Sequence, residues 1–379
     1  MTRSQSLQGP AAESPRQRTY RLSVFAGPTG GHLFPAQSFA EGFRRRFSNA
    51  VIELVTSRRA EDLVGKVPAG VFERVHFLPD FGFADRFSWK TFKPFLWAPY
   101  LFMRSLFYLL KFRPDLCVGF ASFASYPGMM TAHLLKIPTL IHEQNLVPGK
   151  ATRWLAPHMD LAAASFPGTE FSSGLKKVCT VGLPLRSGLV NAREGKTGFA
   201  VPLSVLVVGG SQGAHGLNNA FVTAVGQLSP AERDKLAVTH IAGKQDCSRV
   251  ESQYREWKMP WTVFPFCGEM NAIYNKTDLA VTRAGANTLF ELAYFGVPAL
   301  VVPYPHAGGH QEANARGFAA MGGLMFVRES AETSVWLRDR LREFINKPQE
   351  LIGLSRAMTA QARPRATEDL VELAAELMG

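Results

Sequence analysis

The sequence predicts an α/β protein made of two doubly wound, Rossmann-like parallel-sheet domains that face one another across a cleft. Three observations support this. The chain has 379 residues, 46% of them hydrophobic, which is enough for two cores. Short apolar runs alternate with helical patterns, as in parallel sheets covered on both faces. An apolar run followed by a glycine-rich turn occurs twice, as Arg21–Ala26 before Gly27–Gly31 and as Leu203–Val208 before Gly209–Gly213.

In the first half, a helix is predicted from about His32 to Phe47, directly after the first glycine turn. The later apolar runs predict strands at Val51–Thr56, Leu116–Gly119, Thr139–His142, Leu161–Ala164 and Val178–Val181, with a helix at Tyr126–Lys136. The polar stretch Ser187–Ala200 contains glycine and is predicted to be the linker to the second half.

The second half repeats the pattern, with a helix that starts near Ala286 and a last helix at Thr367–Met378. Its later strands are predicted at Ala237–Ile241, Thr262–Phe264, Leu279–Thr282, Ala299–Val302 and Gly323–Val327. We therefore expect a disordered tail at 1–19, an N-terminal domain at 20–190, a C-terminal domain at 200–360, and a C-terminal helix at 361–379 that packs on the first domain. The tail lacks the apolar region of a signal peptide.

The net charge of +11 lies entirely in the first half. Residues 1–190 hold 23 Lys and Arg against 12 Asp and Glu, whereas the remainder holds 19 of each. A basic half favours an anionic partner, such as a nucleic acid, an anionic membrane or a phosphorylated substrate. The alternative is a generally basic proteome, which the uneven distribution of charge disfavours. The four cysteines are far apart in the sequence and form no CxxC pair, which disfavours a disulfide framework or a zinc site and fits a reducing cytoplasm.

The first glycine turn, GPTGGH at 27–32, has the features of a phosphate-binding loop. A strand that enters a glycine-rich turn at a helix start places free N–H groups beside the positive end of the helix dipole. His32 at its end is a candidate general base, because a helix N-terminus disfavours the imidazolium form. The alternative is an ordinary tight turn. The sequence lacks GxGxxG and GxxxxGK[ST], which disfavours nicotinamide dinucleotides and Walker-type nucleotides.

The second half supplies candidate groups for a nucleotide sugar. Ser211 adds a hydroxyl to the second glycine loop, and Glu291 lies one to two turns into a helix, where a carboxylate can accept both ribose hydroxyls. The stretch 303–314 concentrates amides and imidazoles, which suit sugar hydroxyls. Helix capping is the alternative for both. In the first half, HEQN at 142–145 ends a strand and is expected to face the cleft; it is not the HExxH of zinc proteases.

The segment Phe81–Arg113 combines 12 aromatic residues with six Lys and Arg and one acid. Its uncharged runs are too short to span a bilayer. Aromatic rings with cations are typical of a surface that docks on an anionic membrane. The alternative is an aromatic-rich core with cations at its edge.

Six motifs, taken together and in order, resemble the MurG family of undecaprenyldiphospho-muramoylpentapeptide β-N-acetylglucosaminyltransferases. They are GPTGGHLFPA, HEQNLVPGKATRWLA, VGLPLR, VVGGSQGAHGLNNA, TRAGANTLFELAYFGVPALVVPYP and HQEANA. The resemblance as a whole covers about Arg21 to the C-terminus. The resemblance implies a GT-B fold and inverting, metal-independent transfer of N-acetylglucosamine from UDP-GlcNAc to the C4 hydroxyl of lipid I, which gives lipid II. It implies a peripheral protein of the bacterial inner membrane, on the cytoplasmic face, that needs no cofactor and binds no nucleic acid.

The resemblance also assigns roles to individual residues. It makes His32 the base and Glu291 the ribose ligand, while Cys267 lies where the main chain contacts uracil and Gln311 where an amide recognises the sugar. The other substrate-binding positions are Thr29, Gly30, Gly31, Asn145, Arg186, Ser211, Ala286, Asn287, Thr288, Leu289 and Phe290.

The chain departs from the commonest family pattern at four positions, Pro28, Thr152, Leu183 and His215, where Gly, Asn, Asn and Arg are frequent. Pro28 lacks an N–H, which places the phosphate contacts of the first loop in question. Three other functions remain open from the sequence: a different GT-B lipid or polyprenyl glycosyltransferase, a UDP-sugar epimerase, and a non-enzymatic nucleic-acid binder. No nucleic-acid motif supports the last of these.

Overall fold

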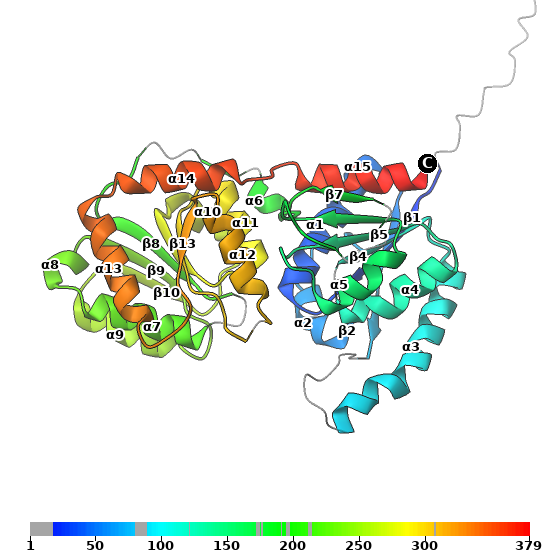
Figure 1. Ribbon diagram of the computed structural model, residues 1–379, viewed down its shortest axis with the longest axis horizontal. Helices are drawn as coiled ribbons and strands as arrows, with labels where there is room; N and C mark the ends of the chain where they lie inside the picture. The colour runs from blue at the N-terminus through cyan, green and yellow to red at the C-terminus, as the bar shows by residue number, and fades with distance from the viewer. Residues whose placement is uncertain are drawn as a thin grey trace, which may run out of the picture.

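The computed structural model describes residues 18–79, 89–120, 122–171, 175, 177–190, 192–194, 198–210, 214–306 and 308–379, with main chain only at 89–97. Figure 1 shows two α/β domains side by side along the long axis of the molecule. The two sheets have seven and six strands, and every strand pair is parallel. The fold is therefore the predicted pair of doubly wound domains.

The N-terminal domain has the strand order β3-β2-β1-β4-β5-β6-β7. Its central strand β1 is buried from its second residue onward, and Val24 is in register with Leu54 and Val118. The strands are β1 (Arg21–Ala26), β2 (Val51–Ser57), β3 (Arg74–Leu78), β4 (Leu116–Phe120), β5 (Thr139–Glu143), β6 (Leu161–Ala164) and β7 (Val178–Thr180), and the helices are α1 (Gly30–Arg46), α2 (Glu61–Val64), α3 (Trp89–Phe112), α4 (Tyr126–Leu134) and α5 (Lys150–Leu155).

The C-terminal domain repeats this topology with the order β10-β9-β8-β11-β12-β13. Central strand β8 is almost wholly buried. The strands are β8 (Leu203–Val208), β9 (Leu236–Ile241), β10 (Trp261–Phe264), β11 (Leu279–Thr282), β12 (Ala299–Val301) and β13 (Leu324–Phe326), and the helices are α7 (His215–Gly226), α8 (Pro230–Arg233), α9 (Cys247–Trp257), α10 (Met270–Lys276), α11 (Ala286–Phe295), α12 (His310–Ala319), α13 (Thr333–Asn346) and α14 (Glu350–Ala360).

The chain crosses between the domains twice. The first crossing includes α6 (Ser187–Val190), so part of the stretch predicted as a linker is helical. At the second crossing the chain leaves α14 on the C-terminal domain and forms α15 (Ala366–Met378) on the N-terminal domain (Figure 1). Helix α15 packs on α1, and its buried residues Leu370, Val371, Leu373 and Ala374 belong to the N-terminal core.

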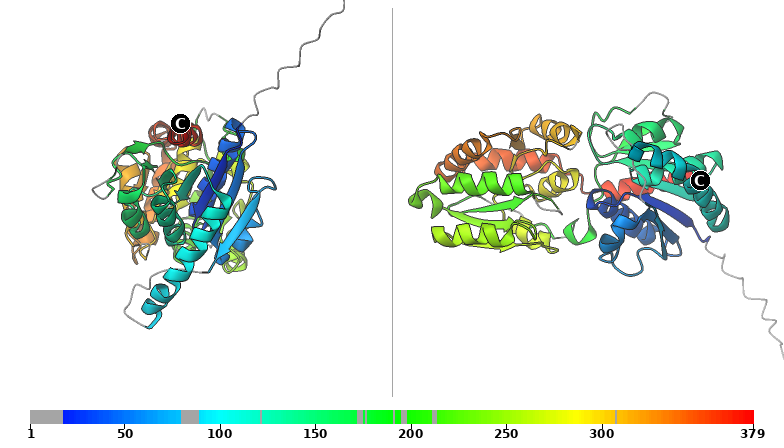
Figure 2. Two further views of the ribbon diagram at one scale, coloured as in Figure 1. Left: turned by 90° about the vertical axis from the view of Figure 1, so that its right-hand side faces the viewer. Right: turned by 90° about the horizontal axis from the view of Figure 1, so that it is seen from below.

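Strand β3 and helix α3 have no counterpart among the strands and helices predicted from the sequence. Strand β3 was not predicted, because Arg74 and His76 alternate with Val75 and Phe77 and no apolar run marks this edge strand. Helix α3 forms part of the segment Phe81–Arg113, and its first turns extend away from the domain (Figures 1 and 2). Residues 81–88 of that segment lie outside the described part of the chain.

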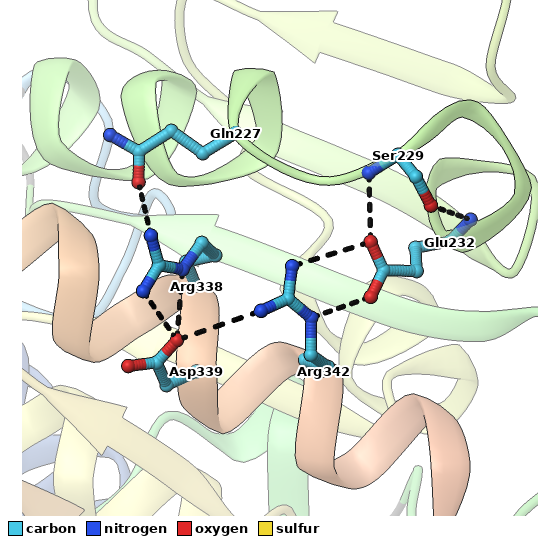
Figure 3. Close-up of polar contacts among 6 residues, drawn as sticks. All are labelled: Gln227, Ser229, Glu232, Arg338, Asp339 and Arg342. Atoms are coloured by element: carbon cyan, nitrogen blue, oxygen red, sulfur yellow. Dashed lines mark hydrogen bonds and ion pairs between the residues drawn. The ribbon is translucent and has the colours of Figure 1, made fainter.

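A charged network ties α8 to α13 on the outer side of the C-terminal domain (Figure 3). Ser229 and Glu232 form a reciprocal capping box at the start of α8. Arg342 of α13 donates from Nε to Glu232 Oε1 at 2.6 Å, and this bond, followed by the bond from the Ser229 N–H, lowers the pKa of Glu232 to about 2. The network fixes the outer helices and does not contact the site described next.

Candidate active site between the two domains

The first glycine loop places His32 in the first turn of α1. The Nδ1 atom of His32 lies 2.8 Å from Thr29 Oγ1, and Thr29 is the N-cap residue of the helix. The ring is partly exposed but deeply surrounded, and burial lowers its pKa to about 4. The imidazole is therefore neutral near pH 7. The helix dipole was the expected cause of a neutral ring, whereas desolvation is the dominant one.

Gly27 makes room for this ring. A Cβ at position 27 would lie 2.9 Å from His32 Nδ1 and 2.8 Å from both Cβ and Oγ of Ser122. Contacts that close do not occur between real side chains, so glycine is required where the loop passes His32. Gly31, by contrast, has only Thr29 Oγ1 near its Cβ position, at 3.6 Å.

Helix α11 of the C-terminal domain meets this loop directly. Asn287, in its first turn, donates from Nδ2 to the carbonyl oxygen of Gly30 at 3.0 Å. Its Oδ1 is buried and has no hydrogen-bond partner among the described residues. The candidate base and the candidate nucleotide-binding helix are thus joined across the domain boundary, although they are more than 250 residues apart in the sequence.

Glu291 lies in the second turn of the same helix and is almost completely buried. Its Oε2 accepts a hydrogen bond from the Tyr274 hydroxyl at 2.7 Å, and its Oε1 lies 3.4 Å from Arg186 Nη2. The guanidinium of Arg186 in turn stands over the ring of Phe34 in α1, 5.0 Å from its centroid. The carboxylate is therefore held by one group from its own domain and one from the segment that leads into the linker.

Gln311 connects two loops of the C-terminal domain. Its Oε1 accepts the N–H of Ala284 at 3.1 Å and the N–H of Tyr304 at 2.9 Å. These bonds occupy both lone pairs of the carbonyl oxygen, so the side chain can offer a ligand only its amide N–H groups. The sugar-binding role predicted for Gln311 is therefore restricted to donation.

The HEQN motif is only partly directed at the other domain. Asn145 Oδ1 accepts from Asn314 Nδ2 at 3.0 Å, and Asn314 Oδ1 accepts the Leu146 N–H at 2.9 Å. His142 and Glu143 are fully buried, so the expectation that both face a cleft is wrong. His142 lies beside the Gly182 carbonyl, and Glu143 accepts four bonds, two from Asn145, one from Gly149 and one from Thr152 of α5.

The remaining predicted residues fall into three groups. Leu289 and Phe290 are core residues, so their side chains do not line a site, and Ala286 is buried beside them. Cys267 and Thr288 are half-buried. Ser211 lies outside the described residues. Of its loop, Gly209 and Gly210 are described, and a Cβ at Gly209 would lie 2.3 Å from that of Ala214.

Sequence reasoning missed Tyr274 and assigned no individual contact to Glu143 or Asn314. Each is buried and makes hydrogen bonds to a predicted site residue. Glu143 and Asn314 stand inside quoted motifs, which was a usable signal. Tyr274 lies in a helix with no such signal.

Comparison with known proteins assigns the chain. The glycosyltransferase family 28 N-terminal and C-terminal domain models match residues 22–163 and 204–370. A UDP-N-acetylglucosamine–N-acetylmuramyl-(pentapeptide) pyrophosphoryl-undecaprenol N-acetylglucosamine transferase of Allorhizobium ampelinum is 35% identical over 94% of this chain and 95% of its own length. The protein of the same name from Desulfotalea psychrophila is 36% identical over 84% and 86%. The crystal structure of Acinetobacter baumannii MurG superimposes with a TM-score of 0.73 at 28% identity, covering 94% of this chain and 99% of that one.

The chain belongs to the MurG family of glycosyltransferases. A UDP-N-acetylglucosamine 2-epimerase also superimposes, with a TM-score of 0.63, but at 11% identity it shares only the fold. The GT-B architecture inferred from the motifs is thereby confirmed.

The structure shows the surroundings of each residue at which this chain departs from the commonest MurG sequence. The hydroxyl of Thr152 donates to Glu143 Oε2 at 2.5 Å, and Leu183 is a core residue. His215 donates from Nδ1 to Asp246, 2.8 Å from Oδ1. Pro28 precedes the N-cap residue of α1, outside the helix. Among the described residues of this MurG-family chain, no helix is long and apolar enough to cross a membrane.

Proposed function

We propose that this enzyme transfers N-acetylglucosamine from UDP-GlcNAc to the C4 hydroxyl of the N-acetylmuramyl-pentapeptide on undecaprenyl pyrophosphate, with inversion at the anomeric carbon. The product is the lipid-linked disaccharide used in peptidoglycan synthesis, and the substrates are those named for the relatives. The observation that carries the proposal is the contact of the His32 loop with α11 through Asn287 and Gly30.

His32 is the base in this scheme. If Thr29 accepts the Nδ1–H bond, the lone pair of Nε2 is free to take the proton of the acceptor hydroxyl. The hydroxyl oxygen then attacks the anomeric carbon, and the bond from that carbon to the UDP oxygen breaks. A low pKa keeps the ring unprotonated and ready over the whole neutral range.

The donor is assigned to the C-terminal domain. Glu291 accepts the ribose hydroxyls, and the amide of Gln311 donates to the sugar. The leaving diphosphate carries charge that main-chain N–H groups of the second glycine loop and the α7 N-terminus stabilise. The sequence has no Asp-x-Asp motif to bridge a divalent cation, so we expect full activity in EDTA. Activity that disappears in EDTA and returns with Mn²⁺ would contradict this mechanism.

Membrane docking is assigned to the outer face of α3. Tyr100, Met103, Phe107 and Leu110 are exposed there, with Met103 and Phe107 at 65% and 71%. Their spacing of three, four and three residues places them on one side of the helix. Arg104, Lys111 and Arg113 add positive charge at its solvent-facing edges. Phe102, in the same helix, is half-buried with its ring against Tyr126, so it does not belong to this exposed face.

The decisive experiment measures UDP release from UDP-GlcNAc with and without a lipid I analogue. We expect release to depend on the acceptor and the product to carry a β linkage. Release with a diacylglycerol acceptor instead would point to another lipid glycosyltransferase. Formation of an epimer without any acceptor would point to an epimerase.

A further inference from the structure

Tyr274 is a fully buried tyrosine whose hydroxyl has an unusual partner. It donates to Oε2 of Glu291 at 2.7 Å, and its ring packs against Phe295, 5.2 Å between centroids. Burial, and then the neighbouring carboxylate, raise the pKa of this phenol well above its ordinary value. Tyr274 therefore keeps its proton at neutral pH and acts as the hydrogen-bond donor to Glu291.

The hydrogen bond from Tyr274 leaves some acceptor positions of the Glu291 carboxylate available to a ligand. A carboxylate offers about four acceptor positions, two on each oxygen. Tyr274 uses one on Oε2 and Arg186 uses one on Oε1. One acceptor position remains on each oxygen, which matches the two donors of a vicinal diol.

The bond also fixes the orientation of the carboxylate. Arg186 lies at a longer distance, 3.4 Å, and retains a buried Nε without a partner among the described residues. The shorter bond from Tyr274 comes from a ring held in the core, so it has the stronger influence on the side-chain torsion of Glu291. Without it, the carboxylate is free to rotate toward Arg186 and pair with it through both oxygens.

We propose that Tyr274 is a positioning residue for donor recognition, which holds the Glu291 carboxylate so that each oxygen accepts one hydroxyl of the ribose diol. This inference rests on the proposed role of Glu291. It adds that the preference for a ribose over a deoxygenated sugar depends on a residue that does not touch the donor.

The test compares two probes, UDP and 2′,3′-dideoxy-UDP, by calorimetry on the full chain. Tyr274→Phe should weaken UDP about tenfold and leave the dideoxy compound within about twofold, because only the diol uses the positioned oxygens. Equal weakening of both probes, or weakening of neither, overturns the inference.

Tyr254→Phe is the matched control. Tyr254 is another fully buried tyrosine of this domain, and its hydroxyl lies 2.8 Å from His240 Nδ1, in a different part of the core. This variant loses one buried hydrogen bond but should bind both probes as the wild type does. Its melting temperature also sets the loss of stability that is expected from such a bond alone.

A second arm covers failure of Tyr274→Phe to fold. In Glu291→Ala there is no carboxylate that Tyr274→Phe could leave without its hydrogen-bond donor. The UDP affinity of Glu291→Ala is therefore compared with that of the double variant Glu291→Ala, Tyr274→Phe. Equal UDP affinities there support the inference, and a further loss overturns it. If the wild type itself does not distinguish the probes, the ribose assignment of Glu291 fails first, and the inference with it.

Discussion

The two domains have the same strand order, yet their surfaces and loops differ. Residues 1–190 carry the whole net charge of the chain, and the N-terminal domain exposes an apolar side of α3, whereas the charges of residues 191–379 balance. At the domain boundary, the first domain presents a partly exposed histidine and the second a buried carboxylate and a fixed amide. One scaffold therefore holds two different sites, and the loops and charges determine which function each half performs.

The largest effect on activity is expected when the candidate base is removed from the first domain. His32→Ala should lower turnover by about 10²–10⁴-fold, the usual contribution of a general base, with UDP affinity near that of the wild type. His133→Ala, in the same domain but outside the site, is the control. Near-normal turnover of the His32 variant would exclude it from the chemistry.

The pH dependence of kcat/KM also tests whether His32 is the base. Because the pKa of His32 is lowered to about 4, the ring gains its proton only well below pH 6.5. We therefore expect kcat/KM to stay level from neutral pH down to about 5 and to fall toward pH 4. A fall centred near pH 6.5 would mean that the ring is not desolvated.

The next largest effect is expected in the second domain. Glu291→Ala should weaken UDP binding by about 1.5–3 kcal/mol through the loss of charged hydrogen bonds. Calorimetry on the folded variant measures this, with Glu251→Ala on α9 as the control. Unchanged UDP affinity would remove Glu291 from the donor site.

A smaller effect, on membrane binding, is expected from the exposed surface of the first domain and not from that of the second. Replacing Met103, Phe107 and Leu110 with Ser removes apolar contact worth about 1 kcal/mol or more per side chain if they insert. Binding to vesicles with anionic lipid should fall at least tenfold, while turnover of a short-chain, water-soluble acceptor is preserved. Met321→Ser with Ile352→Ser, exposed on the other domain, should bind vesicles normally. Normal binding by the α3 variant would require a different docking surface.

The smallest effect concerns stability and is confined to the second domain. Arg342→Ala should lower the free energy of unfolding only slightly, because solvent screens this partly exposed pair. The pKa of Glu232 is lowered to about 2 from 4.5, so the stabilisation is present above pH 4.5 and is lost as the pH falls toward 2. Chemical denaturation at pH 7 and pH 3 measures both, with Arg255→Ala as the exposed control.

The sequence predicts the buried strands best. Strands β1, β6, β8 and β11 have the predicted bounds, because a strand buried on both faces is a continuous apolar run between turn residues. Edge strand β3 escapes detection because its partly exposed residues form no such run.

The site could be predicted only as a set of motifs. Glycine turns mark where a loop approaches a ligand, and His32 follows from one of them. The pairing of Asn287 with Gly30 and of Tyr274 with Glu291 depends on how distant elements pack, and no local pattern encodes it. The burial of Leu289 and Phe290 likewise follows from the tertiary position of α11.

The position of α15 also constrains how the protein is made. Its apolar face completes the core of the first domain, but it is synthesised only after the whole C-terminal domain. Until then, α1 lacks the helix that covers it, for tens of seconds at typical rates of synthesis. The N-terminal domain therefore lacks this part of its core until the C-terminal domain has been synthesised, and the uncovered face of α1 is open to non-native contacts during that time.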